Sequence, residues 1–381
     1  MTDSPCVRAE HADLRRQVAR FVQQQVEPNA LAWDEAGRVP REVLRRMGTL
    51  GWLGLRYAPE FGGAGSDTVT SVVFQEALSR STSGGFVITA LVHTDMASPH
   101  LANAGNAEQK ARWLPSICRG ECITAVAVTE PDAGSDVASL RTRAVRDGSD
   151  WVLNGTKMFI TNGVHADLYF VAARTDAHAR GARGISIFAV EKATPGLRVS
   201  RALHKQGWLA SDTAELAFEN CRVPAANLIG DEGEGYKIAL SGLEGGRIGI
   251  ASQSLGMARA AYEAALRYAK ERVAFGKPIF EHQAVQFRLA DMATQLEAAR
   301  QLIHHAARMK DAGQPCLKEA AMAKLFASEM AERVCSDAIQ VHGGYGYVTD
   351  FPVERIYRDV RVCQIYEGTS DIQRILIARG L

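Results

Sequence analysis

Glu367 is the acidic residue whose neighbours favour chemistry most clearly. It lies just before an expected helix start, because Ser370 and Gln373 have the Ser-x-x-Gln spacing of a capping box with Ser370 as the N-cap. An acid at this place could simply interact with the positive end of the helix. Burial against Ile365 and Tyr366 would instead raise its pKa from the ordinary value of about 4.3 toward neutrality, which suits a general base. These residues alone leave both interpretations open.

A glycine-rich helix is the second feature with chemical meaning. Gly242, Gly245, Gly246 and Gly249 fall within one expected helix, although a glycine in a helix interior costs about 1 kcal/mol relative to alanine. Their spacing places Gly242, Gly245 (or Gly246) and Gly249 along one face. This pattern predicts either a close helix crossing or a bare groove for a thin, extended substrate.

Histidines and cysteines indicate no metal site. His304 and His305 are adjacent on an expected helix and point to different faces, and a lone His93 is more typical of a structural role. The seven cysteines are odd in number and include no Cys-x-x-Cys pair. Reduced thiols in the cytoplasm therefore fit better than disulfides or zinc.

Composition excludes several classes of function. Lys and Arg total 44 against 43 for Asp and Glu, so no basic surface for nucleic acid or anionic membranes is expected. No apolar run reaches the roughly 20 residues of a membrane helix, and the N-terminus has no apolar signal segment. Phosphate-loop, dinucleotide-binding, zinc-protease and serine-hydrolase motifs are absent from the 381 residues.

Hydrophobic periodicity divides the chain into helices, strands and helices. Residues 1–120 and 226–381 have helical spacing, whereas residues 121–225 contain short apolar runs separated by turn-formers such as Asn154-Gly155. We expect an N-terminal helical domain, a middle antiparallel barrel or sandwich, and a C-terminal helical domain. Strands are predicted at 123–128, 151–153, 158–160, 168–172, 185–190 and 214–218, and helices at 74–104, 236–272, 283–310, 317–341 and 371–379.

Five motifs in fixed order resemble those of the acyl-CoA dehydrogenase family. They are Val126 to Asp136, Lys157 to Gly163, Arg272 to Lys277 with Gln283, Gln340 to Gly346, and Ile365 to Asp371. The resemblance covers nearly the whole chain and looks most like the short-chain and short branched-chain subgroups. It implies a mostly α fold with a central β domain, in which the C-terminal domain is a four-helix bundle.

The resemblance also implies a reaction. The family removes hydrogen from the α and β carbons of a saturated acyl-CoA to give a trans-2-enoyl-CoA, and Glu367 matches the base that takes the α-proton. Flavin N5 would take the β-hydride, and electrons would pass to an electron-transferring flavoprotein. Some relatives carry the base just before Arg247, where this chain has Gly246, which cannot act. Substrate contacts are implied for Ser135, Glu244, Arg247, Tyr366 and Gly368.

FAD is the implied cofactor, and part of its site would come from a second chain. The matching positions within the β domain and near the base are Val126, Val128, Thr129, Gly134, Ser135, Phe159, Ile160, Thr161, Thr369, Ser370 and Asp371. The positions implied to reach the FAD of a neighbouring subunit are Arg272, Phe275, Gln283, Gln340, Val341, Gly343 and Gly344. The resemblance thus implies a homo-oligomer, a tetramer built as a dimer of dimers.

Other functions on the same fold stay open. An acyl-carrier-protein dehydrogenase of a biosynthetic pathway would share these residues, whereas the family's oxidases are usually longer chains. A non-catalytic, DNA-associated flavoprotein would be expected to have a basic extension and to lack Glu367. The acyl chain length is open too, because Ala202 to Lys205 and Ser211 to Thr213 resemble longer-chain relatives.

Overall fold

The first part of the computed structural model is helical. The model describes residues 8–179 and 181–381, except the side chains of residues 241–244. Its N-terminal helices are α1 Ala9–Phe21, α2 Ala30–Ala36, α3 Arg41–Thr49, α4 Thr68–Leu78, α5 Gly84–Leu91, α6 Ser98–Ala104 and α7 Ala107–Cys118. The predicted helix from Phe74 to Ala104 is interrupted at residues 79–83, where Glu27 accepts hydrogen bonds from Ser81 and Thr82. Ser83 then caps α5 by accepting from the Phe86 amide.

The middle part is an eight-stranded sheet. Its strands are β1 Thr124–Ala127, β2 Arg143–Asp147, β3 Asp150–Thr161, β4 Leu168–Arg174, β5 Ile185–Glu191, β6 Leu197–Ala202, β7 Thr213–Pro224 and β8 Leu228–Ile229. The order is β6-β7-β3-β2-β4-β5-β8, and β1 pairs with β4. The two short runs predicted at 151–153 and 158–160 form one strand, β3, whose register with β7 shifts near Gly155.

The expectation of a purely antiparallel sheet is wrong. β1 and β4 are parallel, as is the single pairing of β2 with β4. A hairpin cannot join parallel neighbours, which need a longer crossover connection. Here the β2–β3 hairpin lies between β1 and β4 in the chain, and it gives the connection the length to bring β4 back in the direction of β1.

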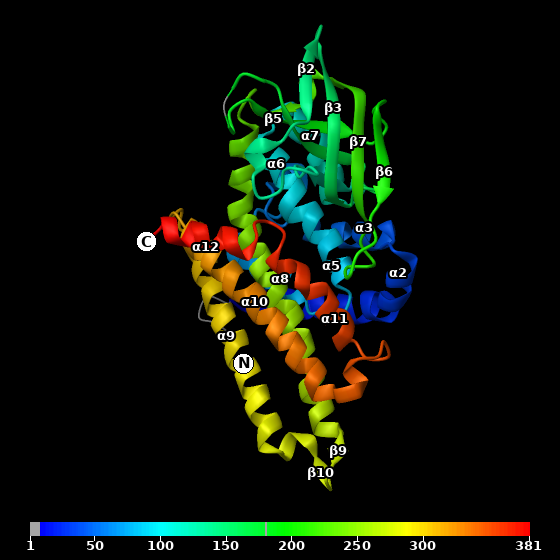
Figure 1. Cartoon of the computed structure of the whole chain (residues 1–381), viewed down its shortest axis with the longest axis vertical. Coiled ribbons are helices and arrows are strands. Elements are labelled where there is room, and N and C mark those ends of the chain that lie inside the picture. Colours follow the sequence, from blue (N-terminus) through cyan, green and yellow to red (C-terminus); the bar gives the residue numbers. More distant parts are fainter. Residues whose placement is uncertain (1–7, 180) are drawn as a thin grey trace.

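Three long helices dominate the last part of the chain. The elements are α8 Gly235–Glu271, β9 Val273–Ala274, β10 Lys277–Pro278, α9 Gln283–Asp311, α10 Leu317–His342, α11 Val353–Val360 and α12 Ser370–Arg379. The predicted long helices are confirmed, whereas α11 was not predicted. α8 and α10 pack through small buried residues such as Ala258, Ala261, Ala327 and Ala331. Figure 1 shows the sheet at one end of the molecule and the β9–β10 hairpin at the other.

A buried charge cluster joins α4 to α8 and α9. Glu76 on α4 lies 2.8 Å from Arg300 of α9 and 2.9 Å from Arg259 of α8, and its side chain is only 3% exposed. Burial alone would raise the pKa of this carboxyl, but the guanidinium groups of Arg300 and Arg259 outweigh burial and hold the pKa at about 2. The helices that carry the site are therefore tied together by charge as well as by packing.

Over the described ranges, no helix is long and apolar enough to cross a membrane, and no group of three or more His, Cys, Asp or Glu side chains is placed to hold a metal ion. Some buried polar side chains in these ranges form hydrogen bonds between separate elements of the chain. His93 is an example, because its ring contacts the Thr124 hydroxyl at 3.1 Å and the Ile117 carbonyl at 3.0 Å. The expected structural role of His93 is confirmed by these contacts.

Replacing Glu76 with glutamine should destabilise the fold strongly. Glu76→Gln removes the buried carboxylate shared by Arg300 and Arg259 and leaves each guanidinium only its more exposed partner, Glu297 or Glu263. Breaking such a buried ion pair costs about 3–5 kcal/mol. The pKa of Glu76 is lower in the folded than in the unfolded protein. In the wild type the stabilisation is therefore complete above about pH 4.5 and is lost as pH falls toward 2. Chemical denaturation at pH 7 measures the difference in the free energy of unfolding between wild type and variant. Glu297→Gln is the control, since Glu297 pairs with Arg300 at 40% exposure and should cost less than about 1 kcal/mol; equal losses would contradict this account.

Candidate active site at Glu367

Glu367 lies in a left-handed turn between α11 and α12. Its φ angle is 54° and that of Gly368 is 88°, so two successive residues adopt the left-handed conformation that side chains disfavour. The expected N-cap at Ser370 is wrong: Thr369 has the extended backbone of a cap and its hydroxyl accepts from the Ile372 amide. Ser370 is already the first helical residue, so the cap lies one residue nearer to Glu367.

The Glu367 carboxyl points at the glycine of the rival base position. A Cβ atom added to Gly246 of α8 would lie 2.9 Å from Glu367 Oε2, closer than real Cβ contacts. Oε2 is buried and has no hydrogen-bond partner among the described residues. Burial raises the pKa of this carboxyl to about 7, against the opposing charges of Arg247 and Lys324. The structure therefore places an unpartnered carboxyl, with a pKa near neutrality, in the space that Gly246 leaves.

Aromatic packing holds the segment before the carboxyl. The Tyr366 hydroxyl donates to Gln253 Oε1 of α8 at 2.7 Å, and its ring meets that of Trp208 edge to face at 5.2 Å. Trp208 is itself fixed by its amide, which donates to the buried carboxylate of Asp359 on α11. Tyr366 thus has a structural role, and its predicted contact with substrate stays a prediction.

Of the two arrangements that the α8 glycine spacing left open, the structure favours a close crossing over a bare groove. Besides Gly246, a Cβ atom on Gly245 would lie 3.3 Å from Arg56 Nη1, and one on Gly249 would lie 3.3 Å from Gln75 Nε2. Each of the three is therefore covered by a side chain from another element, as in a close crossing. The side chains of residues 242 and 244 lie outside the described part, so the substrate role predicted for Glu244 stays a prediction.

The predicted flavin residues of the middle part lie in or next to β1 and β3, or in the loop that follows β1. The Thr129 carbonyl after β1 accepts from the Met158 amide of β3 at 2.9 Å, which brings the two motifs side by side. Phe159 is 66% exposed and has a φ of 61°, so an apolar ring faces outward beside buried Ile160. Val126 and Val128 lie in and after β1, Thr161 ends β3, and Gly134 and Ser135 are exposed in the loop between them.

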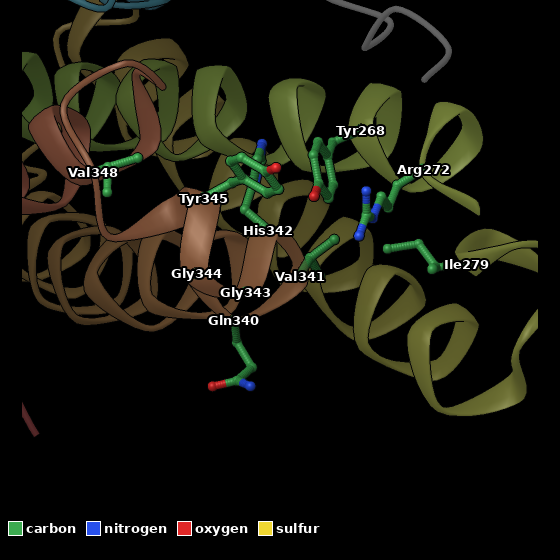
Figure 2. Close-up of a pocket in the computed structure, with 10 residues that line it drawn as sticks. All are labelled: Tyr268, Arg272, Ile279, Gln340, Val341, His342, Gly343, Gly344, Tyr345 and Val348. Carbon is green, nitrogen blue, oxygen red and sulfur yellow. The ribbon is translucent and has the colours of Figure 1, made fainter. Parts of the chain in front are cut away.

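A second group of predicted residues lies at the far end of the C-terminal helices. Arg272, Gln340, Val341, Gly343 and Gly344 line one pocket of about 500 Å³, together with Tyr268, Ile279, His342, Tyr345 and Val348. Figure 2 shows the Arg272 side chain beside Tyr268, whereas the Gln340 side chain extends away from the others. Phe275 is 96% exposed at the tip of the β9–β10 hairpin, and Gln283 is exposed at the start of α9.

The two groups are too far apart to share one cofactor within a chain. Arg247 and Arg272 are 25 residues apart along α8 and its end, which corresponds to about 37 Å of helix. Figure 1 shows the sheet and α12 well away from β9 and β10. An extended dinucleotide is shorter than this span. That the residues near Arg272 reach the FAD of a neighbouring chain stays a prediction.

Comparison with known proteins shows the family of this chain. The N-terminal, middle and C-terminal domains of acyl-CoA dehydrogenase match residues 8–121, 125–221 and 233–381. The short-chain specific acyl-CoA dehydrogenase of Clostridium acetobutylicum is 42% identical over 366 residues, 96% of each chain. The chain belongs to the acyl-CoA dehydrogenase family. It is therefore an FAD oxidoreductase that acts on the CH–CH bond of acyl-CoA.

Two solved acyl-CoA dehydrogenases have nearly the same fold. The butyryl-CoA dehydrogenase of Megasphaera elsdenii superposes with a TM-score of 0.95 at 37% identity and covers 100% of this chain and 99% of its own. The glutaryl-CoA dehydrogenase of Mycobacterium smegmatis, solved in complex with FADH2, has a TM-score of 0.92 at 34% identity, with 98% and 95% covered. The predicted fold class is confirmed, apart from the parallel strands.

Three residues that support the Glu367 segment did not stand out in the sequence. Lys324 and Trp208 had no expected role and Gln373 only that of a capping-box residue, although all three contact the segment around Glu367. The sequence around Lys324 could have indicated a structural partner for it, because a lysine among the alanines of a buried helix face is rare unless it is paired. Trp208 had no such signal, since its contact depends on how three segments meet.

Substituting Gly246 should separate stability from activity. Gly246→Ala gains helix propensity worth about 1 kcal/mol, so we expect no loss of thermal stability. The new methyl group displaces the Glu367 carboxyl, however, and a misplacement of about 1 Å can reduce the rate by about 10²-fold. Gly245→Ala is the control, because the atoms near its new methyl group belong to the flexible ends of Arg56 and Lys310. Full activity in Gly246→Ala, measured by steady-state turnover, would show that the carboxyl does not act from this position.

Proposed function

We propose that the protein oxidises a short saturated acyl-CoA to the trans-2-enoyl-CoA, with Glu367 as the base. The observation that carries the proposal is the buried Glu367 carboxyl, which faces Gly246 and has a pKa of about 7. The hydrogen α to a thioester is a weak acid, so its removal needs a positioned base that is ionised near neutral pH yet basic enough to accept the proton. An ordinary exposed glutamate has too low a pKa for this task.

The proposed reaction divides the two hydrogens between two acceptors. The Cα–H bond breaks and its proton moves to Glu367, whose carboxylate becomes a carboxylic acid in its apolar surroundings. The electrons of the Cα–H bond form the new double bond, and the Cβ hydrogen leaves with the electron pair of its own bond. When bound, FAD supplies the acceptor for that electron pair. Glu367 then returns its proton to solvent, so the carboxyl must titrate close to working pH.

The residues of β1, β3 and the start of α12 fit a flavin. Phe159 offers an exposed apolar face, and no atom lies within 4 Å of where a Cβ on Gly134 would be, so the backbone there is accessible. Ser370 Oγ is buried without a hydrogen-bond partner among the described residues, which leaves a hydroxyl for a polar group of the cofactor. We propose that these residues, with Val126, Val128, Thr129, Ser135, Ile160, Thr161, Thr369 and Asp371, hold FAD.

The substrate and the electron acceptor are proposed from the relatives. The similarity to short-chain specific and butyryl-CoA enzymes favours a short acyl chain, and Ser135, Glu244, Arg247, Tyr366 and Gly368 are the proposed contacts of the thioester and its coenzyme A. An electron-transferring flavoprotein is the proposed acceptor. A cytoplasmic location stays a prediction.

The pocket at Arg272 supports an assembly of several chains. Its guanidinium and the exposed backbone of Gly343 and Gly344 suit a pyrophosphate. Exposed apolar side chains surround this end, including Phe275, Phe287 and Tyr347. We propose that this end covers the FAD of a second copy, in a dimer or a dimer of dimers.

Replacing the carboxyl should abolish reduction of the flavin without abolishing binding. Glu367→Gln keeps the shape of the side chain but cannot accept the proton, so we expect anaerobic reduction by butyryl-CoA to slow by about 10²–10⁴-fold or more. Stopped-flow absorbance of the oxidised flavin band measures the rate, and equilibrium titration confirms that FAD and acyl-CoA still bind. Near-normal reduction would transfer the role of base to another residue.

Oligomers that contain two different variant chains test whether one FAD site is formed by two chains. The Arg272→Glu protein should lose FAD, whereas the Glu367→Gln protein should keep FAD but lose activity. A chain carrying Arg272→Glu still has its own Glu367, and a partner carrying Glu367→Gln still has Arg272. Co-expression of the two inactive variants should therefore restore partial activity in purified mixed oligomers. If each site is complete within one chain, mixing restores nothing.

A further inference from the structure

Lys324 is a buried lysine with no role in the proposed reaction. Its side chain is fully buried on α10, and its Nζ donates a hydrogen bond to the Gly368 carbonyl at 2.7 Å. The ionisable groups that act on it are Glu367, Arg247 of α8, Glu329 of α10 and the Cys363 thiol. Burying an ammonium group is costly unless it is paired, so its place beside the Glu367 turn calls for an explanation.

The turn that carries Glu367 is held by two buried side chains. Gly368 accepts from Lys324 and also from Gln373 Nε2 at 2.9 Å, and the same amide lies 3.3 Å from the Glu367 carbonyl. Lys324 comes from α10 and Gln373 from α12, so the two donors fix the turn from two helices. Without them, the left-handed conformation of Glu367 would cost about 1–2 kcal/mol with little to compensate it.

The charge of Lys324 acts on the carboxyl as well. Burial raises the pKa of Glu367, and the cations Arg247 and Lys324 oppose that rise. Burial lowers the pKa of Lys324 to about 8 while Glu367 opposes that change, so the ammonium is still largely protonated at pH 7. Removing this cation would leave the carboxyl more fully protonated at neutral pH.

We propose that Lys324 is a positioning residue for Glu367, whose buried ammonium fixes the left-handed turn through the Gly368 carbonyl. The same ammonium also places a positive charge near the Glu367 carboxylate, which opposes the rise in its pKa. This inference rests on the proposed function only for its effect on rate. Its structural and electrostatic parts concern Glu367 itself, whatever reaction that residue serves. Gln373 also holds the turn through the Gly368 carbonyl, but it is uncharged and therefore does not affect the ionisation of the Glu367 carboxyl.

Neutral substitutions test both parts. Lys324→Met and Lys324→Gln remove the charge, and both should move the pH midpoint of the reduction rate upward by about one unit, because the carboxyl loses a nearby cation. The rate rises with pH through this midpoint, since the base must be ionised. Gln373→Met removes a hydrogen bond but no charge, so it should lower the maximal rate while leaving the midpoint in place. Lys324→Arg should restore the wild-type midpoint.

The titration of Glu367 gives a readout that does not need turnover. Infrared difference spectra of each FAD-loaded variant against its Glu367→Gln counterpart isolate the carboxyl band, and its pH dependence should shift upward in Lys324→Met. Lys318→Met, on the same helix but 37% exposed, is the control and should shift nothing. An unchanged infrared midpoint in whichever neutral variant folds overturns the inference. If Glu367 is not the base, the infrared shift remains and only the shift in rate is lost.

Discussion

The space beside Gly246 is the constraint on which the site depends. A carboxyl acts as a base near neutrality only if it is taken out of water, and here the Glu367 carboxyl is buried against a helix that has no side chain at the point of contact. Any larger residue at position 246 would compete for the same volume. The glycine is therefore required by the carboxyl, although it weakens the helix that contains it.

The rest of the structure holds both partners of that contact in place. α8 is fixed by packing against α10 and by the Glu76 cluster, so Gly246 belongs to a rigid element. Glu367 is on a turn instead, and a turn needs support from its neighbours. Tyr366, packed on Trp208 and bonded to Gln253, holds the residue before it, and Lys324 and Gln373 hold the carbonyls after it.

The sequence predicted the parts of this structure that depend on local patterns. The long helices follow from apolar periodicity, and Glu367 is proposed as the base because its motif and the glycine at position 246 point to the same chemistry. Contacts between distant segments were not predictable in this way. β1 pairs parallel to β4, with the β2–β3 hairpin between them in the chain. Thr369 and not Ser370 is the N-cap of α12, and Arg56 and Gln75 cover the glycine face of α8.

Exchange of the α-hydrogen tests most directly that Glu367 is the base. The flavin is first reduced, so that oxidation of the substrate cannot occur, and butyryl-CoA is incubated with the enzyme in D₂O while deuterium at Cα is followed by NMR. The wild type should exchange the α-hydrogen, and Glu367→Gln should do so about 10²–10⁴-fold more slowly at equal substrate occupancy. Equal exchange rates in the two proteins would show that another group removes the proton.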